Sequence, residues 1–235
     1  MMMENLPIFN QLSPELWESL WLTLQLAFVV TLILLLVSIP LAYWLSRSKQ
    51  RGMIIVETLV SLPIVLPPTV IGFYLLVLFS PQHPLGAFWL KLTGATLTFS
   101  FTGLVIGSVF YSLPYAVQPI LNAFRSVQQE YIDAALTMGA TRGETFGHVI
   151  LPLSKGGVGV AAILGFAHTL GEFGVVVMLG GSIPGKTRVA SIALYDEVQK
   201  LNYDTAHIFA LLLLLISFLM LLLMAVFQRQ IAREV

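Results

Sequence analysis

Residues 130–152 read EYIDAALTMGATRGETFGHVILP and form the longest polar-rich interval between the apolar runs of this chain. Ile132, Ala135, Leu136 and Gly139 recur at i, i+3, i+4 and i+7, so they share one face of a short helix. Glycine readily adopts the left-handed conformation that ends helices, so Gly139 is predicted to separate this helix from a second short one. Periodicity alone is typical of an ordinary amphipathic linker on a membrane surface.

Small residues leave a shallow depression on the surface of the first predicted helix. Asp133 is followed by Ala134 and Ala135, and neither alanine carries a side chain beyond Cβ. The backbone or an aromatic side chain of another protein can therefore come close at this point. The interval is thus a candidate docking surface as well as a candidate linker.

The composition is that of a membrane protein. Of the 235 residues, 57% are hydrophobic and only 10% are charged, whereas soluble domains carry about 25% charged residues. Five apolar stretches, at about 17–45, 54–80, 97–124, 153–180 and 205–228, reach the length of roughly 20 residues that crosses a bilayer. We therefore predict an all-α integral membrane protein with about five transmembrane helices in a single domain, 1–235. The chain has no cysteine, which excludes disulfides and thiolate metal sites.

Lysine and arginine are distributed unevenly between the two sides of these spans. Eight of the twelve fall on one side and four on the other. The larger set is Arg47, Lys49, Arg51, Arg125, Arg142, Lys155, Arg229 and Arg233, and the smaller set is Lys91, Lys186, Arg188 and Lys200. Because basic loops remain in the cytoplasm, the larger set predicts an N-terminus outside and a C-terminus inside. Residues 130–152 then face the cytoplasm.

The second apolar stretch is rich in helix-breaking residues. Residues 61–76 read SLPIVLPPTVIGFYLL, with Pro63, Pro67, Pro68 and Gly72 within ten positions. Proline removes a backbone donor, and a spanning segment tolerates this where the freed carbonyls face protein, water or a cavity. Two interpretations remain open: a static kink for packing, or a broken region that lines a translocation path together with Ser61 and Thr69.

Ionisable and aromatic side chains lie within the third and fourth stretches. His168 and Glu172 are four residues apart in apolar surroundings, where an ionisable group must be paired or hydrated. A mutual hydrogen bond and a role in a pathway or gate are equally compatible with this spacing. Tyr111 and Tyr115, near the cytoplasmic half of the third stretch, indicate either an interfacial aromatic belt, which we favour slightly, or an inner constriction.

The sequence of residues 130–152 resembles a loop that is shared by the membrane subunits of ATP-binding-cassette importers. In that family the loop docks into a cleft on a cytoplasmic ATPase. The matching residues are Asp133, Ala134, Ala135, Gly139, Val149, Leu151 and Pro152. The sequence departs from the family pattern by Asp for Glu and by Val for Ile, and both changes are conservative. We call residues 130–152 the coupling loop. The resemblance assigns ATPase coupling to Asp133, Ala134, Ala135, Gly139 and Pro152.

Three further segments resemble the oxyanion branch of these permeases. They read TLGEFG at 169–174, GGSIPGKT at 180–187 and SIALY at 191–195. The Gly-Glu-Phe-Gly portion is shared with sulfate permeases, whereas the other portions and the double-proline segment are closer to molybdate permeases. The resemblance covers about residues 20–223. The candidate pathway or gate residues are Ser61, Pro67, Pro68, Thr69, Glu172, Phe173 and Gly174.

The resemblance implies the permease subunit of an ATP-driven importer of a tetrahedral oxyanion, with molybdate favoured and sulfate or tungstate as alternatives. It implies two ATPase subunits on the cytoplasmic side, which carry ATP and Mg²⁺, and a periplasmic or extracellular oxyanion-binding protein. The location implied is the cytoplasmic (inner) membrane of a bacterium or archaeon.

The residues themselves add to these expectations. Five spans are few to enclose a pore, which favours a two-fold homodimer with the path on its axis. No lysine or arginine lies deep within a span, so selectivity is expected to rest with the external protein. We expect no catalytic residue, resident cofactor, metal site or nucleic-acid partner in this chain. A nucleotide-independent anion channel subunit and a membrane scaffold are the competing interpretations.

Overall fold

The structure is a computed structural model that describes residues 14–48, 50 and 52–234, with the backbone alone from 230 to 234. Every regular element among these residues is a helix, so the all-α prediction is confirmed. The elements are α1 Pro14–Arg47, α2 Met53–Val65, α3 Pro68–Phe79, α4 Pro84–Thr93, α5 Phe101–Ser126, α6 Gln129–Thr137, α7 Arg142–Thr145, the π-helical turn η2 Phe146–Ile150, α8 Leu151–Leu153, α9 Lys155–Gly171, α10 Gly174–Gly180, α11 Ala190–Gln199 and α12 Tyr203–Glu234. Of the predicted domain 1–235, residues 1–13 and 235 lie outside the described residues.

Among the described residues, three helices are individually long and apolar enough to cross a membrane: α1, α5 and residues 203–229 of α12. Two bent pairs, α2 with α3 and the segment 142–153 with α9, raise the number of spans to as many as five. This agrees with the prediction of about five transmembrane helices.

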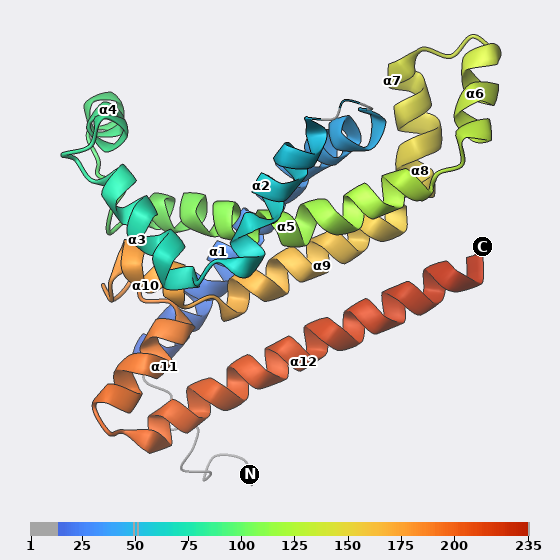
Figure 1. Cartoon of the computed structure of the whole chain (residues 1–235). Coiled ribbons are helices and arrows are strands. Elements are labelled where there is room, and N and C mark those ends of the chain that lie inside the picture. Colours follow the sequence, from blue (N-terminus) through green and yellow to red (C-terminus); the bar gives the residue numbers. More distant parts are fainter. Residues whose placement is uncertain (1–13, 49, 51, 235) are drawn as a thin grey trace, which may run out of the picture.

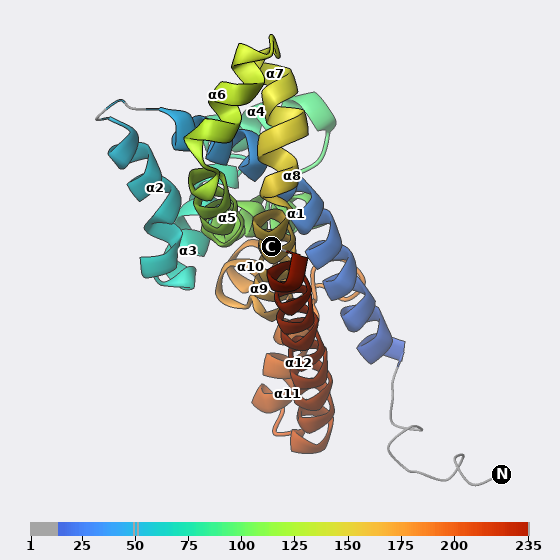
Figure 2. The same cartoon turned by 90° about the vertical axis from the view of Figure 1, so that its right-hand side faces the viewer.

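The core lies where α1, α5 and α9 pack together (Figure 1). Its fully buried side chains include Leu26 and Leu34 of α1, Leu104 and Ile120 of α5, and Val175 of α10. In contrast, α12 lies along α9 and α11, and only 6% of its most apolar 18-residue stretch is buried. The end view in Figure 2 shows α6 and α7 together at one end of this bundle, whereas α11 lies toward the other.

The second predicted span is broken at Leu66 and Pro67. Helix α2 ends at Val65, both linking residues are extended, and α3 leaves at 110° to α2. Pro67 and Pro68 explain the break, because neither has an N–H to donate and each disfavours helical backbone in the residue before it. The predicted disruption of this span is therefore observed as a sharp bend.

The fourth predicted span, 153–180, was expected to be continuous, but it too is broken. Helix α9 ends at Gly171, Glu172 is extended with ψ 133°, and α10 begins at Gly174. No proline lies at this break. The Ser191 hydroxyl of α11 donates a 2.7 Å hydrogen bond to the Glu172 carbonyl oxygen, which thus has a partner outside the helix. A contact between residues so far apart in sequence could not be read from the local pattern.

Two glycines let α3 and α10 pack closely. A Cβ added at Gly174 would lie 2.6 Å from Cβ of Pro68 and 3.2 Å from the Thr69 backbone nitrogen. A Cβ at Gly72 would lie 2.8 Å from Cβ of Met178. The two carbon–carbon separations, 2.6 and 2.8 Å, are shorter than such contacts allow. The two helix breaks can therefore lie against each other only because Gly72 and Gly174 have no side chain.

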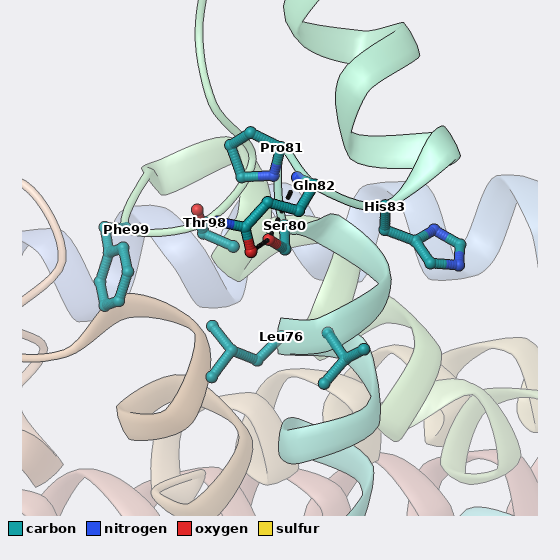
Figure 3. A pocket seen from close by; sticks show the side chains of 8 residues that line it. Leu76, Ser80, Pro81, Gln82, His83, Thr98 and Phe99 are labelled. Atoms are coloured by element: carbon teal, nitrogen blue, oxygen red, sulfur yellow. Dashed lines mark hydrogen bonds between the residues drawn. The ribbon is translucent and has the colours of Figure 1, made fainter.

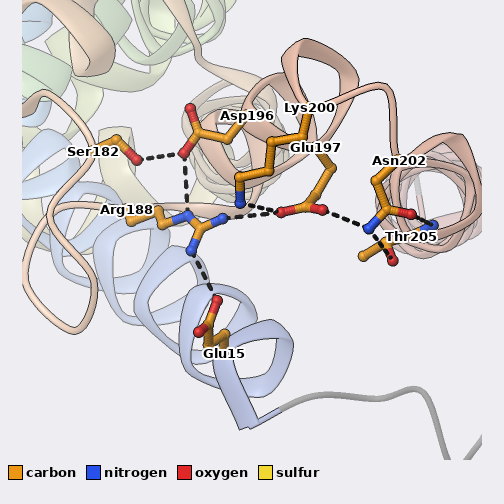
Figure 4. Close-up of polar contacts among 8 residues, drawn as sticks. All are labelled: Glu15, Ser182, Arg188, Asp196, Glu197, Lys200, Asn202 and Thr205. Atoms are coloured by element: carbon orange, nitrogen blue, oxygen red, sulfur yellow. Dashed lines mark hydrogen bonds and ion pairs between the residues drawn. The ribbon is translucent and has the colours of Figure 1, made fainter.

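A cluster of charges joins the ends of α1, α11 and α12 (Figure 4). Arg188 is buried and pairs with Glu15 of α1 at 3.1 Å, Asp196 at 3.2 Å and Glu197 at 3.3 Å. Lys200 and Asn202 also donate to Glu197, and the Lys200 hydrogen bond in particular lowers the pKa of Glu197. The first four residues of helix α11 are buried beside this cluster.

The close contact of α3 and α10 generates a prediction about stability. Gly174→Ala should lower the apparent thermal stability of the purified protein, because overpacking a close contact costs about 1–3 kcal/mol. Gly171→Ala is the matched control, since an added Cβ there meets no atom within 4 Å. Thermal unfolding followed by intrinsic fluorescence measures both variants. Equal midpoints for the two would contradict the packing described here.

Candidate functional site

A pocket of about 520 Å³ lies between the two helix breaks. We call it the break pocket. Its lining residues are Pro68 and Thr69 of α3, Tyr111 of α5, Ala167, His168 and Gly171 of α9, the linking residues Glu172 and Phe173, and Gly174 of α10. Five of the seven predicted pathway residues thus lie together, although they come from segments about a hundred positions apart in the sequence.

The other two predicted pathway residues lie elsewhere. Pro67 is the N-cap of α3 and is absent from the lining. Ser61 is on α2, where its hydroxyl donates to the Glu57 carbonyl oxygen and accepts from the Gln118 side chain, each at 2.8 Å. Glu57 also forms two hydrogen bonds with Arg125 of α5, at 3.1 and 2.8 Å. Ser61 therefore helps to join α2 to α5.

Glu172 brings a carboxyl group to the break pocket. The residue is 5% exposed, and neither carboxyl oxygen has a hydrogen-bond partner among the described residues. Ser108 of α5 lies close enough to interact, but the pair does not reach hydrogen-bonding geometry. Within the described structure, the carboxyl group of Glu172 is therefore unpaired where it meets the pocket.

His168 does not bond to Glu172, so the suggested mutual hydrogen bond is wrong. Its Nδ1 lies 2.9 Å from the Ser112 hydroxyl of α5, and either atom can be the donor, depending on the tautomer. The imidazole also stacks on Tyr115 at 3.8 Å between ring centroids and lies 4.9 Å from Tyr111. Both tyrosines are half-buried and contact α9 through this ring.

The polar groups of the break pocket are hydrogen-bonding groups without a fixed positive charge. No lysine or arginine lines it, and the available groups are the Thr69 and Tyr111 hydroxyls and the His168 ring. The first turn of α3 also begins here, and a helix N-terminus favours negative charge weakly. Such groups can solvate a polar ion during passage.

The coupling loop has the predicted two-helix form. Helix α6 ends at Thr137, and Gly139 has the left-handed φ of 91°. The Ala140 N–H donates to the Ala135 carbonyl oxygen at 3.1 Å, which closes the helix end. Helix α7 follows, with Thr141 and Glu144 forming a reciprocal capping box. The predicted left-handed glycine is confirmed.

The coupling loop presents small and apolar groups to its surroundings. Asp133 and Ala134 are exposed and Ala135 is half-buried. Beside them, Met138 is 87% exposed and Tyr131 is 55% exposed. Exposed apolar side chains of this size next to small residues favour a protein partner. The residues that the resemblance assigned to coupling thus lie on one accessible surface, with the exception of Pro152. Pro152 lies in the short helix α8, which directly precedes α9.

An aromatic cluster attaches the coupling loop to the bundle. The Phe146 ring of η2 lies 4.7 Å from Tyr43 of α1 and 5.9 Å from Phe124 of α5, measured between centroids. Tyr43 and Phe124 also meet edge to face at 6.3 Å. The cluster therefore joins the loop to two long helices. Sequence reasoning missed this cluster, because isolated aromatic residues in apolar stretches have no distinctive pattern.

A further pocket, of about 510 Å³, lies between the end of α3 and residues 98–99 (Figure 3). In Figure 1 this end of α3 lies at the opposite end of α5 from the coupling-loop helices α6 and α7. Ser80, Pro81 and Gln82, in the turn after α3, lie on one side, and Thr98 and Phe99 lie on the other. It contains none of the predicted pathway residues. Within the described part of the chain, no group of three or more His, Asp or Glu side chains could hold a metal ion.

This chain is similar to known transport proteins in both sequence and fold. The family profile described as "Binding-protein-dependent transport system inner membrane component" matches residues 35–235. A molybdenum transport system permease protein of Azotobacter vinelandii is 48% identical over 200 residues, covering 85% of this chain and 88% of that protein. A sulfate transport system permease protein of Escherichia coli is 30% identical over 223 residues, covering 95% and 80%.

Among solved structures, a bacterial ABC transporter involved in alginate import superimposes with a TM-score of 0.80. The alignment covers 96% of this chain and 84% of that chain at 19% identity, so it shows a shared fold. The profile match, in contrast, extends over most of the sequence and includes both the coupling loop and the break pocket. The chain therefore belongs to the family of inner membrane components of binding-protein-dependent transport systems.

Proposed function

We propose that this chain is the permease subunit of an ATP-driven importer of a tetrahedral oxyanion, with molybdate as the favoured ion. The observation that carries the proposal is the break pocket, which joins two interrupted membrane helices in a member of this transport family. The choice of molybdate is supported by 48% identity to a molybdenum permease, compared with 30% for a sulfate permease. The subunit itself is a transport component and not an enzyme.

The pathway runs through the break pocket. Thr69 donates a hydrogen bond to the passing oxyanion, and the prolines at positions 67 and 68 hold the bend that keeps α3 beside α10. Phe173 and Gly174 form the facing wall. Glu172 lines the pocket beside them. Because no lysine or arginine is among the described lining residues, the pocket holds an anion weakly, so the ion is released and selectivity rests with an external oxyanion-binding protein. Ser61 acts at a distance, by holding α2 on α5.

The coupling loop receives energy from outside the chain. Two ATPase subunits on the cytoplasmic side hold ATP and Mg²⁺, and each docks on Asp133, Ala134, Ala135 and Gly139 of one permease, with Pro152 leading the loop into α9. Two copies of the permease form a homodimer around the path. The ATP-bound state shifts the population toward the outward-facing form, which is alternating access.

The proposed orientation places the N-terminus outside and the C-terminus inside. The positions of the basic residues support this orientation. Arg47 and Arg125 lie in the last turns of α1 and α5, and Arg142 lies in α7 of the coupling loop. Lys49 and Arg51 lie outside the described residues, and only the backbone of Arg233 is described. The positive-inside rule then puts the coupling loop in the cytoplasm.

Reconstituted transport tests the function. In vesicles that contain the permease, its ATPase and the oxyanion-binding protein, we expect molybdate uptake that requires ATP and the binding protein, with weaker uptake of sulfate. Tungstate is measured in parallel, because its size and charge are close to those of molybdate. Uptake at the same rate without the ATPase would favour an anion channel subunit, and no uptake under any condition would favour a scaffold.

Variants of the coupling loop test the docking surface. Ala135→Arg places a long charged side chain on the low part of α6, so ATPase recovered with the tagged permease should fall about tenfold or more, the equivalent of 1.4 kcal/mol. Ala87→Arg is the matched control, because Ala87 is exposed on α4, beyond the opposite end of α5. Membrane insertion should be normal for both. ATPase recovery at the wild-type amount with Ala135→Arg would overturn the docking assignment.

A further inference from the structure

We propose that a cavity between the end of α1 and the coupling loop binds the phosphate headgroup of an anionic phospholipid. The cavity has a volume of about 500 Å³. Tyr43, Trp44 and Arg47 line it from α1, and Arg142 and Phe146 line it from the coupling loop. We call it the cationic cavity. It is separate from the break pocket, with which it shares no residue.

The charges of the cationic cavity call for an anion. Arg47 donates one long hydrogen bond, 3.4 Å, to the Phe124 carbonyl oxygen, while its Nε is buried without a hydrogen-bond partner among the described residues. The Arg142 guanidinium forms no hydrogen bond or ion pair with the described part of the chain. No carboxylate is among the described residues that line the cavity. Glu144, near in sequence, accepts hydrogen bonds from Thr141 instead.

Two guanidinium groups match a phosphate group well. Each presents N–H donors in a planar fork that can bind two phosphate oxygens at once. Because the two arginines come from different segments, a phosphate held between them would connect α1 to the coupling loop. The aromatic contact of Tyr43 with Phe146, at 4.7 Å, already brings these segments together beside the cavity.

The surroundings of the cationic cavity favour a lipid as the source of the phosphate. Trp44 is 47% exposed, three residues before Arg47, at the end of a 34-residue apolar helix. Leu36 and Pro40 are also exposed and precede Trp44 at spacings of four residues, so the three form an apolar stripe that leads to the arginine. An acyl chain can lie along this stripe while the headgroup meets the guanidinium groups. Aromatic residues and basic pockets are common at this depth in a membrane.

The inference rests on the proposed orientation, because anionic lipids act on basic residues at the cytoplasmic leaflet. It does not depend on which ion is transported or on ATP. Its test therefore measures lipid binding directly on the full-length chain, without ATPase or substrate. A failure of oxyanion transport would leave the lipid result unaffected, and the reverse also holds.

The experiment measures phosphatidylglycerol bound to the detergent-purified protein by native mass spectrometry, with phosphatidylcholine as the neutral comparison. Arg142→Gln and Arg47→Gln should each weaken phosphatidylglycerol binding about fivefold, which corresponds to roughly 1 kcal/mol per basic residue near an anionic surface. Arg229→Gln is the matched control, because Arg229 is an exposed arginine on α12 outside the cavity. It should bind phosphatidylglycerol like the wild type.

Arg142→Gln decides the outcome even if Arg47→Gln disturbs the fold, since the Arg142 side chain holds no other part of the described structure in place. Equal binding by the Arg142 variant and the Arg229 control would overturn the proposal. Inorganic phosphate in place of lipid separates the two sources of the anion. If millimolar phosphate raised the thermal midpoint as much as phosphatidylglycerol does, the cavity would be a site for a free oxyanion and the lipid assignment would be wrong.

Discussion

The close contact of α3 with α10 is the constraint on which the rest of the structure depends. Gly174 faces Pro68, and Gly72 faces Met178, at separations that leave no room for a Cβ. Each helix follows a break in a membrane segment, and interrupted backbone in a membrane is tolerated where it is buried in protein or lines a cavity. Packing the two breaks together meets this requirement at both places and creates the break pocket.

Charge is distributed so that binding and movement take place at different sites. The break pocket has a buried carboxyl group and no lysine or arginine among its described lining residues, so it can solvate a dianion without strong retention. Fixed positive charge lies instead beside the coupling loop, at Arg47 and Arg142. The Phe146 cluster connects this end to α1 and α5, and Tyr111 of α5 lines the pocket. The arrangement suits a subunit that receives force at one end and changes access in the middle.

The sequence predicted the features that have a local cause. Apolar stretches of spanning length predicted the helices, Pro67 and Pro68 predicted the first break, and Gly139 predicted the end of α6. The second break was missed because its partner, Ser191, lies on another helix. The same reason applies to His168, which bonds to Ser112 and not to its near neighbour Glu172. The buried ion pairs of Arg188 could not be predicted either, because its partners lie on two different helices, α1 and α11. Long-range contacts of single polar residues are what local patterns leave undetermined.

The most direct test of the central claim, that the path runs through the break pocket, uses the absence of cysteine from the chain. In the reconstituted complex, Thr69→Cys is the only thiol of the permease, and its reaction with a membrane-impermeant maleimide is measured with and without ATP. Leu214→Cys, at an exposed apolar position of α12, is the control. The account predicts that Thr69→Cys reacts at a rate that changes with the nucleotide state, while Leu214→Cys remains unreactive. A Thr69→Cys thiol that stays as unreactive as the control in both states would contradict it.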